Sequence, residues 1–75
     1  PKEVQIVNLK ALEKLQVTEI DIAVLKENGL IKNKNILVKV LGFGEITKAI
    51  TLKVNEISKS AQAAIEAQGG KVELV

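Results

Sequence analysis

The sequence predicts a single small α/β domain in which two helices pack on a small sheet that is mostly parallel or mixed. Segments rich in Val, Ile and Leu alternate with segments that carry helix start and stop signals, in the order β-α-β-β-α-β. The apolar residues make up 47% of the chain, which is typical of a globular protein, and 75 residues correspond to one domain. We therefore interpret residues 1–75 as one globular domain.

The first element is a strand. Residues 4–9, VQIVNL, are rich in residues that favour extended backbone. A helical half-turn is expected next, around residues 11–15, because Leu12 and Leu15 are three positions apart.

A helix is predicted over residues 19–28. Thr18 suits its N-cap, and Asp21 stands where the acid of a capping box belongs. Gly29 is expected to end the helix in the left-handed conformation, so that Leu30 folds back on the last turn.

The residue pattern in the middle of the chain predicts a polar loop followed by two strands. Residues 31–35, IKNKN, are the loop. Residues 36–41 are almost continuously apolar, which indicates a strand buried on both faces. Residues 50–54 alternate apolar and polar side chains, which predicts a strand with one exposed face.

The last elements are a helix and a strand. Ser58 suits the N-cap of a helix over residues 59–68, which carries an apolar stripe and ends at Gly69-Gly70. Residues 71–75, KVELV, then form the final strand.

The charged residues favour neither catalysis nor strong nucleic-acid binding. All eleven basic residues are lysines, and nine acids reduce the formal charge to +2. Nucleic-acid binders usually show a larger basic excess and use arginine for bidentate contacts. The chain has no His and no Cys, so it offers no thiolate, no disulfide and no group that titrates near neutral pH without perturbation. We expect no enzymatic activity, no cofactor, no metal and no small-molecule substrate.

No apolar run approaches the length of a membrane span, and residues 1–10 lack the apolar core of a signal peptide. A soluble chain in a reducing, intracellular compartment is expected, without membrane contact. The chain opens on Pro1 rather than Met, as in a processed chain or a piece of a longer one.

Two short motifs resemble a nucleotide-binding loop and a catalytic pair, but a turn and a helix cap explain them better. Gly42-Phe43-Gly44 resembles the start of a dinucleotide fingerprint, but Thr47 stands where the third glycine belongs and a strand follows. A turn is favoured there. Ser58 and Lys59 are adjacent on a helix, so they do not face each other as a nucleophile and its base would.

Three lysines form a candidate phosphate-binding strip. Lys48 and Lys53 lie in or next to one predicted strand, and Lys59 begins the following helix, whose free N–H groups favour anions. Ordinary solvated lysines would give the same pattern. Lys2, Lys10 and Lys14 are expected to lie away from this strip.

Taken together, the motifs in the second half of the chain resemble the C-terminal part of the bacterial large-subunit ribosomal protein fifteen family. The resemblance rests on Val38-Lys39-Val40-Leu41-Gly42-x-Gly44-Glu45, Thr51-Leu52-Lys53-Val54, Ser58-Lys59-Ser60-Ala61, Ile65-Glu66-Ala67 and Gly69-Gly70. Val7-Asn8-Leu9, Val17-Thr18 and Leu25-x-x-x-Gly29-Leu30-Ile31 fall where the family has a similar opening strand and helix. The resemblance therefore covers essentially all 75 residues.

The resemblance implies a cytoplasmic, ribosomal β/α domain with a structural role against large-subunit ribosomal RNA and neighbouring ribosomal proteins. With this role in view, we expect the strip residues Lys48, Lys53 and Lys59 to contact phosphates, with Lys32 and Lys34 as a secondary loop site. The basic, glycine-rich N-terminal extension of the family is absent from these residues, which explains the low net charge.

A second class of function stays open beside RNA binding. The family commonly has more basic residues where this chain has Ala49, a histidine near Asn55 and an aromatic residue near Ile57. Ala49, Asn55 and Glu56 therefore weaken the expected RNA face. The alternative is a non-enzymatic protein-interaction or structural domain, such as an isolated or redesigned fragment, that has lost RNA binding.

Overall fold

The computed structural model describes residues 3–33 and 35–75, and within them it contains helices packed with two small parallel sheets. In chain order the elements are β1 (Val4–Asn8), α1 (Leu9–Glu13), β2 (Glu19–Ile20), α2 (Ile22–Glu27), β3 (Leu37–Leu41), β4 (Thr51–Val54), β5 (Glu56–Ile57), α3 (Lys59–Ala67) and β6 (Lys71–Leu74). The α/β class and the approximate element order are confirmed. No helix in the described residues is long and apolar enough to cross a membrane.

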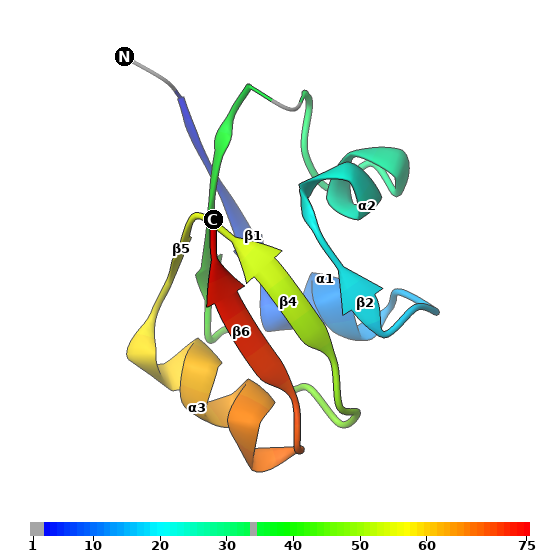
Figure 1. Ribbon diagram of the computed structural model, residues 1–75, viewed down its shortest axis with the longest axis vertical. Helices are drawn as coiled ribbons and strands as arrows, with labels where there is room; N and C mark the ends of the chain where they lie inside the picture. Colours follow the sequence, from blue (N-terminus) through cyan, green and yellow to red (C-terminus); the bar gives the residue numbers. More distant parts are fainter. Residues whose placement is uncertain (1–2, 34) are drawn as a thin grey trace.

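The strands form two three-stranded sheets rather than one. Sheet A has the order β1-β3-β5, sheet B has the order β2-β4-β6, and every strand pair is parallel. In Figure 1, sheet B lies in front and β1 of sheet A lies behind it. The chain passes directly from sheet B to sheet A at Asn55, the single residue between β4 and β5.

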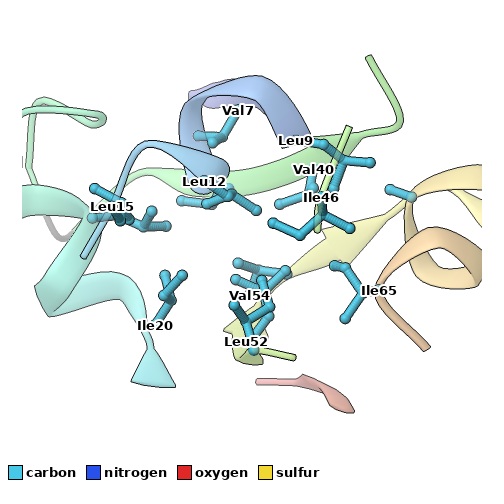
Figure 2. Close-up of a cluster of buried hydrophobic side chains, with 14 of the residues drawn as sticks. Val7, Leu9, Leu12, Leu15, Ile20, Val40, Ile46, Leu52, Val54 and Ile65 are labelled. Carbon is cyan, nitrogen blue, oxygen red and sulfur yellow. The ribbon is translucent and has the colours of Figure 1, made fainter. Parts of the chain in front are cut away.

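The core lies between the two sheets. Because alternate side chains of a strand point to opposite faces, each sheet buries one face and exposes the other. Figure 2 shows Val7 and Val40 of sheet A on one side of the core, and Leu52 and Val54 of sheet B on the other. The helices close the ends with side chains that are at most 1% exposed, namely Leu9, Leu12, Leu25, Ala61 and Ile65.

The strands predicted from the sequence at 4–9, 36–41, 50–54 and 71–75 are present, each one residue shorter than predicted. The half-turn expected around 11–15 is a short helix, α1, that begins earlier, at Leu9. A helix starts there because β1 ends at Asn8 and the side chains of Leu9 and Leu12, three positions apart, are both buried.

The helix predicted over 19–28 begins three residues later than expected, so Thr18 is not its N-cap. Glu19 and Ile20 pair with β4, and the carbonyl of Thr18 accepts a hydrogen bond from the Thr51 N–H, with N and O 2.7 Å apart. This pairing keeps the chain extended up to Asp21. Asp21 is the cap, since its Oδ1 accepts from the Val24 N–H at 2.9 Å.

The predicted end of this helix is confirmed. Gly29 has φ +77°, and its N–H donates to the Lys26 carbonyl at 3.0 Å. The N–H of Leu30 donates to the Leu25 carbonyl at 2.9 Å. These two hydrogen bonds are those of a Schellman motif, which satisfies the last carbonyls of the helix.

The second predicted helix is also confirmed, as α3. Ser58 is its N-cap, with Oγ accepting from the Ala61 N–H at 3.2 Å. The helix ends with the same motif as α2, because Gly69 has φ +83° and the N–H of Gly70 donates to the Ile65 carbonyl at 3.0 Å.

Candidate nucleic-acid interface

The connection between β3 and β4, residues 42–50, runs along α1. The Lys10 N–H donates to the Phe43 carbonyl at 3.1 Å, which satisfies one of the free amides at the start of α1. Gly44 has φ +96°, and a Cβ there would lie 2.7 Å from the Lys10 backbone nitrogen. The turn expected at Gly42 and Gly44 is thus a site of close backbone packing, in which the Phe43 carbonyl accepts a hydrogen bond from α1.

Lys48 belongs to this connection and is half-buried. Its ammonium donates to the carbonyl of Leu15, just beyond the end of α1. The neighbouring Thr47 donates its N–H to Glu13 Oε1 at 3.2 Å and its hydroxyl to Glu13 Oε2. Lys48 therefore has a structural partner, and it holds the 42–50 connection against α1.

The same contacts affect one carboxyl group. The hydroxyl of Thr47, then its N–H, and more weakly the charge of Lys48 stabilise the ionised form of Glu13 and hold its pKa below the ordinary value of 4.5. Glu13 is thus ionised at neutral pH, and its charge lies beside that of Lys48.

Lys53 points outward from the middle strand of sheet B. Its Nζ lies 3.7 Å from Oε2 of Glu73, which is the residue opposite it on β6. The concave surface around it is lined by four acids and two lysines: Glu19, Asp21, Glu66, Glu73, Lys53 and Lys71. Acids outnumber lysines on this surface, so it repels phosphate as a whole.

Lys59 is the first residue of α3 and is exposed. Near it, the Ser58 hydroxyl occupies the Ala61 N–H, and a Cβ on Gly42 would lie 3.1 Å from the Ala61 nitrogen. The cap and the Gly42 backbone thus lie where an anion would approach Ala61. Ser58 Oγ also lies 3.3 Å from Ser60 Oγ.

Of the secondary loop site, the structure describes Lys32, whereas Lys34 lies outside the described residues, as does Lys2. Lys32 is exposed, and its N–H donates to Oε1 of Gln5 on β1 at 3.4 Å.

The three lysines predicted as one strip lie in different surroundings: Lys48 contacts the end of α1, Lys53 lies opposite β6, and Lys59 begins α3. Each has a different environment. Lys59 and Lys32 are exposed, Lys53 shares its charge with an acid, and Lys48 donates to a carbonyl.

The structure also shows a basic groove that the sequence interpretation did not identify. It lies between α1 and the end of α2, and its lining residues are Asn8, Lys10, Ala11, Lys14, Leu15, Asn28 and Leu30. The available signal was the spacing of Lys10 and Lys14, four positions apart and hence on one helix face. Within the described residues, no group of three or more His, Cys, Asp or Glu side chains is arranged to hold a metal ion.

Comparison with known proteins agrees with the resemblance in the sequence. The profile of a family described as ribosomal proteins 50S-L15 and 50S-L18e, together with a 60S relative, matches residues 5–73. A large ribosomal subunit protein uL15 of Mesoplasma florum is 57% identical over 74 residues, which are 99% of this chain and 51% of that protein.

Two further relatives with the same name come from Lactobacillus acidophilus and Mycoplasma capricolum. They are 48% and 46% identical, again over 99% of this chain and 51% of their own length. The chain therefore spans about half the length of the curated relatives it matches. The family match extends from the first strand of the fold to the last. This chain belongs to the family of ribosomal proteins that includes 50S-L15 and 50S-L18e.

Proposed function

We propose that this domain is a non-enzymatic structural constituent of the large ribosomal subunit, and that it binds ribosomal RNA through lysine–phosphate contacts. The observation that carries the proposal is the family match over residues 5–73, together with relatives named as large-subunit ribosomal proteins. The partners are large-subunit ribosomal RNA and neighbouring ribosomal proteins, and the place of action is the ribosome in the cytoplasm.

We rank the proposed contacts by what each lysine must give up in order to reach a phosphate. Lys59 and Lys32 are exposed, and their ammonium groups can reach a phosphate without losing a partner that the structure shows. Lys53 must share its charge between a phosphate and Glu73. Lys48 must first leave the Leu15 carbonyl, so we place it last. Lys34 belongs to the same proposal as the loop neighbour of Lys32.

The first prediction tests this ranking by titrating the domain with purified large-subunit ribosomal RNA at several salt concentrations. Each phosphate contact releases about one counterion, so the affinity falls as salt rises. Lys59→Gln should weaken binding and reduce the salt slope by about 1. Lys48→Gln should lower the melting temperature and leave the slope nearly unchanged, because it removes a hydrogen bond within the fold.

Lys71→Gln provides the matched control, since it removes the same charge from an exposed strand position on the acid-rich surface. An equal loss of affinity from Lys59→Gln and Lys71→Gln would mean diffuse charge attraction without a defined contact. An absence of binding by the unaltered domain at low salt would favour the alternative of a protein-interaction domain.

A further inference from the structure

The groove beside α1 combines an apolar floor with a basic rim. It has a volume of about 400 Å³. Ala11, Leu15 and Leu30 provide apolar surface, and Lys10 and Lys14 are exposed. Lys10 lies in α1 and Lys14 is its C-cap with helical backbone angles. The two are four residues apart and therefore lie on the same helix face, with Cβ atoms about 5–6 Å apart.

The groove differs from the outer face of sheet B in its charge. The residues that line it include two lysines and two asparagines and no carboxylate, whereas four carboxylates line the surface over sheet B. The side chain of the nearest acid on α1, Glu13, is bonded to Thr47 of the 42–50 connection. The groove is therefore positively charged, whereas the concave surface over sheet B is acidic.

The walls of the groove are held in place from both sides. On one side, the Lys10 N–H is bonded to Phe43, so the first turn of α1 is attached to the 42–50 connection. On the other side, Asn28 Nδ2 donates to the Val24 carbonyl at 2.9 Å, and the Leu30 N–H donates to Leu25. A surface that is already ordered loses little conformational entropy when a ligand binds.

A further lysine lies beside the strand that contributes to the groove. Lys32 is bonded through its N–H to Gln5 of β1, and Asn8 of the same strand lines the groove. Leu30, two residues before Lys32, lines it as well. Lys32 thus adds a third positive charge to the part of the chain that borders the groove.

We propose that this groove binds a single strand of RNA, with Lys10 and Lys14 on successive phosphates and the apolar floor under a ribose or base. The proposal rests on the proposed function and assigns a second contact site to it. The volume is in the range that accommodates a drug-sized ligand, and thus roughly one nucleotide rather than the width of a duplex. The side-chain amides of Asn8 and Asn28 supply donors and acceptors for a base edge or a 2′-hydroxyl.

The second prediction removes the two rim charges. The double variant Lys10→Gln/Lys14→Gln keeps good helix formers on α1, so the fold should be retained. Its affinity for a short polyuridine strand should fall, and the salt slope should flatten by roughly 1.4, which is two contacts at about 0.7 each for a single strand. The matched control is Lys39→Gln/Lys71→Gln, which removes the same charge from the outer faces of the two sheets.

Amide chemical shifts locate the binding site independently of the variants. On addition of polyuridine to the unaltered domain, the shifts of residues 8–15 and 28–32 should change most. Equal losses of affinity from the two double variants, or shift changes concentrated elsewhere, would overturn the groove as an RNA site. Equally tight binding of polyglutamate at the same residues would replace RNA by an acidic protein segment and would also overturn it.

The outcomes separate this proposal from the previous one. If Lys59→Gln weakens ribosomal RNA binding and Lys10→Gln/Lys14→Gln does not, the proposed function stands and the groove is not an RNA-binding site. If polyuridine binds in the groove and ribosomal RNA binding is unaffected by Lys59→Gln, the groove stands and the ranking of Lys59 is wrong. If neither RNA binds, both proposals fail.

Discussion

Asn55 shows how one side chain can connect the two sheets. It occupies the bend between β4 and β5, where its Oδ1 accepts from the Val38 N–H at 2.8 Å. Its Nδ2 donates to the carbonyl of Val75 at 3.2 Å. The family resemblance suggested that an asparagine here weakens an RNA face, whereas the structure gives it a role in the fold.

The lysines show the limit of what a sequence reveals at the residue scale. Their positions and approximate elements could be predicted, because lysines within an alternating pattern occupy its exposed face. Their partners could not, because Lys48 meets Leu15 and Lys53 meets Glu73 only after the chain has folded. A lysine that donates to a carbonyl and one that is free have the same local sequence signal.

The third prediction concerns the carboxylate beside Thr47. Because the folded state lowers the pKa of Glu13, its contribution to stability is fully present above the ordinary pKa of 4.5. It is lost as the pH falls through the lowered pKa. Glu13→Gln should therefore melt at a lower temperature than the unaltered domain at neutral pH.

Melting curves of both proteins from pH 7 down to pH 3 provide the measurement. The two melting temperatures should converge as the pH falls. Protonation of Glu13 removes the carboxylate charge from the unaltered domain, and Glu13→Gln lacks that charge at every pH. A difference that stays constant with pH would mean that ionisation of Glu13 is irrelevant to stability.

At the scale of the element, the sequence predicted those helix boundaries that depend on neighbouring residues alone. The stops at Gly29 and Gly69 and the cap at Ser58 depend on residues within one helical turn, and all are found. The start of α2 depends on pairing between β2 and β4, which are some thirty residues apart in the sequence. A good cap at Thr18 was overridden by this long-range pairing, and Asp21 took its place.

The fourth prediction tests this displaced helix start. Asp21→Ala removes the acceptor of the Val24 N–H and should destabilise the domain by about 1 kcal/mol. Thr18→Ala should cost much less, because Thr18 contributes a backbone carbonyl that alanine retains. Urea denaturation followed by circular dichroism gives both free energies of unfolding, and a larger cost at Thr18 would restore the helix start predicted from the sequence.

At the scale of the whole molecule, the element order could be predicted, but the division into two sheets could not. The predicted strands are compatible with one sheet, and nothing local in the segment 51–57 indicates that β4 and β5 belong to different sheets. The division follows from burial. Val38 and Val40 on one sheet, and Leu52 and Val54 on the other, are fully buried only when the two sheets face each other across one core.

The fifth prediction follows from this shared core. A domain of this size has a stability of roughly 4–11 kcal/mol at 0.05–0.15 kcal/mol per residue. Leu52 is 0% exposed, so Leu52→Ala should cost about 2–5 kcal/mol, a large part of the total. Val4→Ala, on the exposed face of sheet A, should cost far less because Val4 is 50% exposed.

Native-state hydrogen exchange distinguishes one cooperative unit from two. Because both sheets bury their inner faces against each other, Leu52→Ala should reduce the protection of amides in β3 of sheet A by the same free energy as in β4 of sheet B. If only the amides of sheet B lost protection, the sheets would unfold independently. Equal losses would show that β3 of sheet A and β4 of sheet B unfold together, as one cooperative unit around the shared core.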